Sequence, residues 1–219
     1  MSEPVLKAII KLFALVAKED TVTKHEREYI EVFLSDHLNQ KYVQNQLQVF
    51  DEYAKDASDK LGKLDQESIG KLCSEINQEV DRKQKTIVML ELMSLILADG
   101  NITETEERLA KSIGQAFNIA TSDIDLIKTF IVSKTPESID NENILIISGS
   151  GNTGSKTKTI KREDIDGFMS VLHVQSTNLF FARYLGHSDV YLNGVPQKPG
   201  NIHALATGSI VRWGVADAV

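Results

Sequence analysis

The sequence predicts an α+β protein of two domains: an all-α bundle of about seven helices over residues 1–134, a linker at 135–141, and a small antiparallel β-sandwich over 142–219. Three observations predict this class. Residues 1–139 carry 17 lysines and arginines against 24 acidic residues, and therefore hold the whole net charge of −7. Nine of the 13 glycines and three of the four prolines follow residue 135, where short strands need frequent turns. The apolar period also changes from helical to β-type at the linker.

Apolar residues recur at the spacing of one helix face throughout the first domain. Pro4 suits a first helical turn, and the apolar stripe behind it runs from Val5 to Val16. The segment 83–98 contains the longest apolar run of the chain, Ile87 to Ala98 with Glu91 inside it, so we expect it to be the central helix. Further amphipathic helices are expected at 23–38, 42–57, 65–80, 103–117 and 121–133.

An internal repeat relates two parts of this domain at an interval of 80 residues. The apolar segment 12–17 matches 92–97, and the Thr23 and Glu26 pair matches Thr103 and Glu106. The same unit of helix, acidic turn and helix therefore occurs twice. Two such units packed about a pseudo-twofold axis would bury their apolar helices against each other and bring the two turns to comparable places.

The threonine and glutamate of each turn have the spacing of a capping box. In a capping box the hydroxyl and the carboxylate satisfy free amides at the start of a helix, and this is the primary role we expect for Thr23 with Glu26 and for Thr103 with Glu106. The second turn is not an EF-hand calcium loop, because aligning its glycine places Leu95 at the first ligand position.

Capping leaves further carboxylates at the end of the preceding helix unexplained. A carboxylate there opposes the helix dipole, and a bound divalent cation would relieve the repulsion. Hard oxygen ligands favour calcium or magnesium over zinc. The alternative is that these carboxylates are simply hydrated. The carboxylates that this argument makes candidate metal ligands are Glu19 and Asp20 in the first copy and Asp99 in the second.

The doubled pattern of apolar helix, Asp-Gly turn, Thr-x-x-Glu and second helix resembles the TerB-like family, the helical domain of tellurite resistance proteins, over residues 1–133. The resemblance implies a seven-helix fold with an acidic face proposed to hold a divalent metal. By this resemblance Asp99 and Glu106 are the leading ligands, joined by Glu19, Asp20 and Glu26 of the first copy. The first turn departs from the family, since Lys18-Glu19-Asp20-Thr21 replaces the Ala-Asp-Gly form.

The second domain contains six short β-type runs separated by Gly, Asn, Ser and Pro, which favours a small antiparallel sandwich. The glycine-rich segment 149–157 resembles a phosphate loop, but Ser155 stands where the lysine is required. A flexible hairpin loop is the favoured interpretation of that segment. The runs lie at 144–147, 171–174, 179–184, 190–192, 202–205 and 210–213.

Residues 142–214 resemble a forkhead-associated (FHA) β-sandwich. The segment from Ser170 to His173 matches its Ser-x-x-His motif, and Asn193-Gly194 matches its second Asn-Gly hairpin. The resemblance implies phosphothreonine peptides as ligands, with Ser170 and Asn193 as candidate contacts. The sequence departs from the family at two places, since Val171 replaces its arginine and Ser188-Asp189 replaces its first Asn-Gly. The arginine matters because a phosphate dianion needs charge-assisted hydrogen-bond donors. The alternative is that Ser170 and Asn193 only shape turns.

These features together predict a non-enzymatic regulatory or protein-interaction module. No Gly-x-Ser-x-Gly motif occurs, and the five histidines have no metal-ligand spacing. The acidic balance excludes nucleic acid as a partner of the helical part. No apolar run reaches the roughly 20 residues that span a bilayer, so we expect no direct membrane insertion. The single cysteine, Cys73, indicates a reducing compartment, hence the cytoplasm.

The tandem of TerB-like and FHA-like domains resembles the N-terminal cytoplasmic part of a larger membrane-associated protein of the ATP-binding-cassette (ABC) transporter type. The resemblance implies a place at the membrane face, with a protein partner or the downstream domains of a longer chain as ligand. The end at Val219 without a closing helix is compatible with such a parent chain. The alternative function is a sensor of divalent metal or of metal stress, as in tellurite resistance.

Overall fold

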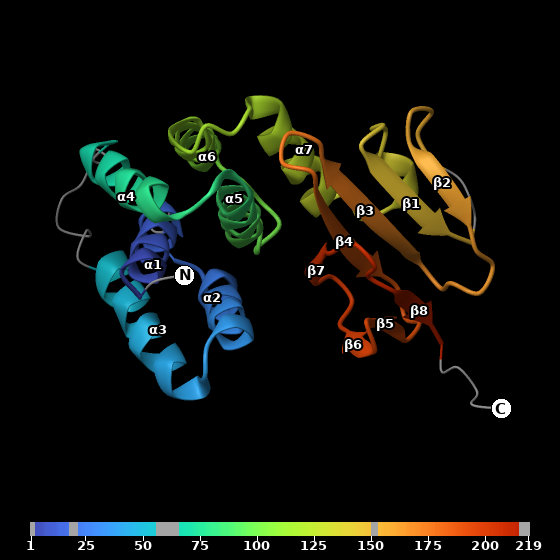
Figure 1. The fold of residues 1–219 in the computed structure, drawn as a ribbon, viewed down its shortest axis with the longest axis horizontal. Helices are drawn as coiled ribbons and strands as arrows, with labels where there is room; N and C mark the ends of the chain where they lie inside the picture. The colour runs from blue at the N-terminus through green and yellow to red at the C-terminus, as the bar shows by residue number, and fades with distance from the viewer. Residues whose placement is uncertain (1–2, 18–21, 56–65, 150–152, 215–219) are drawn as a thin grey trace. The chain divides into compact units, whose positions relative to one another are not determined.

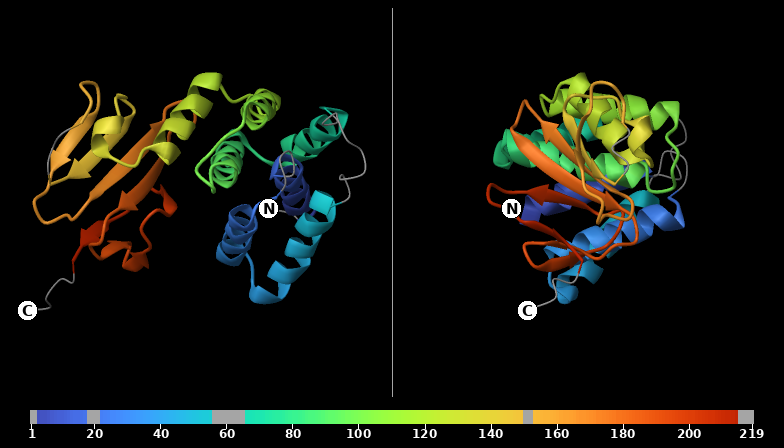
Figure 2. Two further views of the ribbon diagram at one scale, coloured as in Figure 1. Left: turned by 180° about the vertical axis from the view of Figure 1, so that it is seen from behind. Right: turned by 90° about the vertical axis from the view of Figure 1, so that its right-hand side faces the viewer.

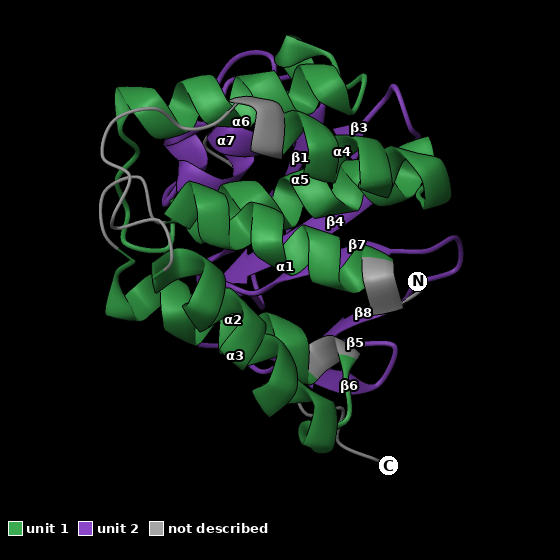
Figure 3. Cartoon of the chain, turned by 90° about the vertical axis from the view of Figure 1, so that its left-hand side faces the viewer, with its two compact units in different colours: residues 1–125 green, residues 126–219 purple. Residues whose placement is uncertain are grey.

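Helices precede strands along the chain, which confirms the α+β class and the two-part layout (Figure 1). The computed structural model describes residues 3–17, 22–55, 66–149 and 153–214. It divides into two compact units, residues 1–125 and 126–219, and the division falls inside the last helix (Figure 3). The helices in the described part are α1 (Glu3–Ala17), α2 (Lys24–His37), α3 (Gln40–Lys55), α4 (Gln66–Glu79), α5 (Arg82–Ile96), α6 (Glu104–Ala116) and α7 (Thr121–Val132).

The 80-residue repeat of the sequence is a repeat of three helices. Helices α5, α6 and α7 begin 79, 80 and 81 residues after α1, α2 and α3 respectively. Within the first unit α1 and α5, the two apolar helices, pack against each other. Helices α3 and α4 also pack on α1, and α2 and α6 pack on α5 (Figure 2). Nine of the 15 residues of α5 are buried, as expected for a central helix.

Three of the described helices, α2, α5 and α6, begin at a residue whose side chain satisfies a free amide of the first turn. Asp81 caps α5 by accepting from the Gln84 amide at 2.8 Å, while the Gln84 side chain accepts from the Asp81 amide at 3.0 Å. Gly100 follows α5 with a φ of +89°, a conformation that strains any residue with a Cβ. Among the described helices, none combines the length and the apolar content needed to cross a membrane.

The second unit contains two sheets. One has the strand order β2-β1-β3-β4-β7 and the other β6-β5-β8. All neighbouring strands pair antiparallel except β1 and β2, which are parallel, with Leu145 opposite Lys158. The strands are β1 (Ile144–Ser148), β2 (Lys158–Lys161), β3 (Phe168–Val174), β4 (Leu179–Leu185), β5 (Val190–Leu192), β6 (Val195–Gln197), β7 (Ile202–Leu205) and β8 (Val211–Trp213).

The parallel pair corrects one prediction. A hairpin loop joins antiparallel strands, whereas parallel strands need a connection that runs back along the sheet. The segment 149–157 between β1 and β2 is therefore not a hairpin, and that prediction was wrong. The sequence Lys158 to Lys161 that follows it forms an edge strand.

The core of the second unit lies between its two sheets. Met169, Ala182 and Tyr184 of the larger sheet pack with Val190, and partly buried Trp213 of the smaller sheet packs against this cluster. The cavity left there measures about 10 Å³, about the size of one water molecule. On the opposite face of the larger sheet, alternate residues of β1 and β3 are also buried, Ile146 and Leu172 among them. The sheet therefore has apolar side chains buried on both faces.

Candidate functional site

The second acidic turn holds a complete capping box. The carboxylate of Glu106 accepts from the amide of Thr103 at 2.7 Å and from its hydroxyl at 2.9 Å. The amide of Glu106 in turn donates to the Thr103 hydroxyl at 3.2 Å. Glu106 is only 3% exposed. This candidate metal ligand therefore has a structural role at the start of α6.

The first turn repeats this geometry. The amide of Thr23 donates to the carboxylate of Glu26 at 2.7 Å, the Glu26 amide donates to the Thr23 hydroxyl at 3.2 Å, and Glu26 is likewise 3% exposed. Both threonines have extended backbone angles, with φ near −80° and ψ near 160°. Two other candidate ligands, Glu19 and Asp20, lie outside the described residues.

Asp99 differs from the two buried glutamates because its carboxylate is exposed. One oxygen accepts from the backbone amide of Asn101 at 2.8 Å, which shapes the turn after α5. Across the described part of the chain, no three side chains of the His, Cys, Asp and Glu types are grouped as a metal site requires. The structure thus places Asp99 at the surface and Glu106 in a helix cap.

The helices that follow the two turns differ in the charge of their first turns. The first turn of α6 contains Glu104, Glu106 and Glu107, whereas that of α2 contains Glu26 alone. Lys24 and Arg27 of α2 occupy the repeat positions of Glu104 and Glu107. Glu107 pairs with Lys111 at 2.9 Å, and this hydrogen bond raises the pKa of Lys111. Among the described residues of the two turns and the helix starts after them, the exposed acidic residues therefore lie at the second turn, where Asp99 and Glu104 are exposed.

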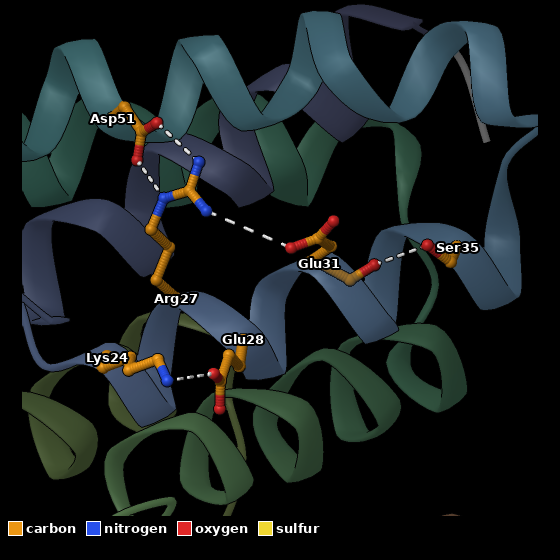
Figure 4. A network of polar contacts seen from close by, with 6 residues as sticks. All are labelled: Lys24, Arg27, Glu28, Glu31, Ser35 and Asp51. Carbon is orange, nitrogen blue, oxygen red and sulfur yellow. Dashed lines mark hydrogen bonds and ion pairs between the residues drawn. The ribbon is translucent and has the colours of Figure 1, made fainter.

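The basic residues of α2 enter a polar network with α3 (Figure 4). The guanidinium of Arg27 donates to both carboxylate oxygens of Asp51, at 3.1 and 3.0 Å, and lies 4.0 Å from Glu31. The bond to Asp51 raises the pKa of Arg27. Lys24 pairs with Glu28 at 3.3 Å. The network joins two helices of the first copy, and the spacing of these residues in sequence did not indicate it.

The two candidate phosphopeptide contacts have intramolecular partners. Ser170 lies in the middle of β3, is 2% exposed, and donates its hydroxyl to the carbonyl of Arg183 at 3.4 Å. Asn193 has a φ of +51° in the turn between β5 and β6, and its side-chain oxygen accepts from the Ile210 amide at 2.9 Å. Ser170 is thus hydrogen-bonded within the sheet, and Asn193 shapes a turn.

The hydroxyl of Tyr184 connects the loop before β3 with the loop after β4, where the two loops cross; the sequence did not predict this contact. Its hydroxyl donates to the carbonyl of Asp166 at 2.5 Å and accepts from the amide of Ser188 at 2.7 Å. A Cβ on Gly167 would lie 2.1 Å from the carbonyl oxygen of Leu185, and one on Gly186 would lie 2.0 Å from that of Asp166. The close approach of these backbones requires glycine at both places.

In the segment that resembles a phosphate loop, amides of the described residues 153–157 donate to acceptors within the chain. The Lys156 amide donates to the carboxylate of Asp140 at 2.7 Å, and the Gly154 amide donates to the carbonyl of Ile139 at 3.0 Å. The Thr157 hydroxyl donates to Ile139 at 2.9 Å. Ile139, in the segment predicted as a linker, is fully buried. These amides are therefore committed to the chain itself rather than turned toward a phosphate.

Comparison with known proteins gives one match. A family model described as "Tellurite resistance protein TerB" matches residues 6–129, more than half of the chain and the greater part of the helical unit and α7. No curated protein and no solved structure matches the chain.

Proposed function

The chain belongs to the family of tellurite resistance protein TerB, and from that premise we propose that it is a non-enzymatic interaction module whose second acidic turn binds a basic surface of a protein partner. The helical unit supplies the charge for this role, because residues 1–139 hold the entire negative balance of the sequence. A charged surface of this kind steers an oppositely charged partner and sets its orientation.

The observation that carries the proposal is the charge difference between the two copies of the repeat. Glu106 and Glu26 are buried in helix caps, but Asp99 and Glu104 beside the second cap are exposed. A carboxylate in the first turn of a helix is stabilised by the helix dipole and can be presented to a partner at no cost to the fold. The first copy has Lys24 where the second has Glu104.

The β unit extends the proposal to the kind of protein in which such a module works. We propose that the chain is the N-terminal cytoplasmic part of a larger membrane-associated protein of the ABC-transporter type, and that downstream domains of that protein are its partner. The support for this is the division of the chain into two compact units, each of which has a surface of its own to offer to other domains.

The test compares two variants that remove the same charge from different places. Asp99→Asn with Glu104→Gln neutralises the proposed surface, while Glu75→Gln with Glu142→Gln neutralises two exposed acids elsewhere. Binding of an oligolysine peptide to the full chain is measured by fluorescence anisotropy at low and physiological salt. We expect about a tenfold loss of affinity in the first variant only. An equal loss in both variants contradicts the proposal.

A second candidate function is the binding of a divalent cation, as in a metal-stress sensor. The exposed carboxylate of Asp99 follows the C-terminal end of α5, where the helix dipole disfavours it and a cation would stabilise it. Calorimetry with calcium, magnesium and zinc tests this function. Heat that disappears in Asp99→Asn supports it, and no heat at millimolar metal rules it out.

A further inference from the structure

Strand β2 ends the larger sheet with one edge unpaired by any described strand. Its pairing with β1 includes a hydrogen bond from the Arg162 amide to the carbonyl of Ser148 at 2.9 Å. Peptide groups point to alternate sides along a strand, so those of Thr159 and Lys161 are directed away from β1. These groups form the edge that another strand could join.

The side chains along this edge are basic, with one large apolar residue among them. Lys156, Lys158, Lys161 and Arg162 fall within seven residues that contain no acid. Lys161 and Arg162 pair with Glu163 and Asp164 in exposed ion pairs, which solvent screens. Neither Lys156 nor Lys158 forms an ion pair with the described residues. Positive charge therefore remains along the start of the strand.

Ile160 adds an apolar contact to this charge. It is 46% exposed and lies opposite Ile147 of β1, so the two share one face of the sheet. Lys158 and Ile160 are two residues apart and therefore lie on the same face. An added strand would meet a lysine at one position and an isoleucine two positions further along.

We propose that the β2 edge binds an extended acidic segment of a partner protein, which adds to the larger sheet as a further strand. A second copy of the same strand is disfavoured because it would place lysines against lysines. An acidic strand instead forms main-chain hydrogen bonds to the outward peptide groups and pairs its carboxylates with the lysines. An apolar residue two positions from an acid would cover Ile160. The inference is independent of the acidic turn, since it uses only residues of the second unit.

The experiment uses the full chain and a short labelled peptide with the repeat Glu-Glu-Val-Val, which places a glutamate and a valine two positions apart on each face of the added strand. Two N-methylated forms carry the same charge, each with the amides of one edge blocked. The unmodified peptide and the form whose blocked amides point away from β2 should bind. The form whose blocked amides face β2 cannot donate to the edge and should bind at least about tenfold more weakly. Hydrogen exchange should slow at the amides of Thr159 and Lys161 when the peptide is added. Equal binding of both methylated forms would mean attraction by charge alone and would overturn the proposal.

Protein variants provide the second arm. Lys158→Glu should weaken the binding of the glutamate peptide. Lys198→Glu, an equal charge change at an exposed position after β6, should leave the affinity for that peptide within about twofold of that of the original chain. A lysine and valine peptide of equal length should not bind the original chain. An oligothymidylate that bound as tightly as the acidic peptide, and left the exchange of Thr159 unchanged, would point to a nucleic-acid surface and overturn the proposal.

Discussion

Thr103 and Glu106 each satisfy a backbone amide of the other, the amide of Thr103 donating to the Glu106 carboxylate at 2.7 Å and the amide of Glu106 to the Thr103 hydroxyl at 3.2 Å. Thr23 and Glu26 form the same two bonds at the same distances. The buried carboxylates of the repeat, Glu26 and Glu106, therefore cap the starts of α2 and α6. The carboxylates of Asp99 and Glu104, beside the second pair, are instead exposed.

The first prediction concerns these caps. Thr103→Ala removes the hydroxyl that accepts from the Glu106 amide and should lower the free energy of unfolding by about 1 kcal/mol. Thr23→Ala should have a similar effect, because the two caps share one geometry. Urea denaturation followed by circular dichroism measures both. Ser112→Ala, exposed on the same helix, is the control, and a loss as large there would show that the cap is not the cause.

The second prediction concerns the crossing of loops at Tyr184. Tyr184→Phe keeps the ring but leaves the carbonyl of Asp166 and the amide of Ser188 without the hydroxyl between them. We expect a loss of about 1–3 kcal/mol in unfolding free energy. Tyr191→Phe on β5 removes a hydroxyl outside the crossing and should be nearly neutral. Equal stability of the two variants would contradict the role given to Tyr184.

The third prediction concerns Arg183 on β4. Its guanidinium donates to the carbonyls of Phe130, Ile131 and Ser133 at the end of α7, at 3.2, 2.5 and 3.3 Å. Burial lowers the pKa of Arg183, yet an arginine stays charged at every pH at which the protein is studied. Arg183→Ala should cost about 2 kcal/mol, because it leaves carbonyls at a helix end without their charged donor.

Two comparisons make the Arg183 prediction specific. Arg212→Ala on β8 removes an exposed arginine and should change thermal stability little. Hydrogen exchange in Arg183→Ala should rise first at the amides of the last turn of α7. Protection that falls evenly over the whole second unit would indicate a general loss of packing instead.

The fourth prediction concerns Cys73 on α4. Burial raises the pKa of its thiol from 9.0 to about 11. The thiol should therefore resist alkylation by iodoacetamide at pH 8 in the folded chain and react in denaturant, since the thiolate is the nucleophile. Because the folded-state pKa is the higher one, the contribution of the thiol to stability is present below pH 9 and is lost as the pH rises toward about 11. Alkylation at equal rates in the folded and unfolded chain would contradict this burial.

Much of the helical unit could be predicted from local patterns. The apolar stripes placed α1 and α5 in the core, and the Thr-x-x-Glu spacing identified the starts of α2 and α6 within a residue. These features depend on residues three or four positions apart, a range that a sequence displays directly. The repeat added long-range information, because two copies of one pattern imply two copies of one structure.

The features that sequence did not predict depend on distant partners. Arg183 and its acceptor Ile131 are 52 residues apart, and Tyr184 and Asp166 are 18 apart. The parallel pairing of β1 with β2 was missed because a glycine-rich connection of nine residues has the composition of a hairpin loop. Ile139 was placed in a linker because Pro136 signals the end of a helix, although the residues after it fold into the second unit.

The acceptors of Arg183 also decide where the chain can be cut for recombinant work. A fragment that begins at residue 142 would contain the guanidinium but none of the three carbonyls that accept its hydrogen bonds, so a partly buried cation would lose these acceptors. A fragment that begins at residue 126 retains them all. Expression boundaries for the sheet portion are therefore best drawn inside α7 rather than at the proline that follows it.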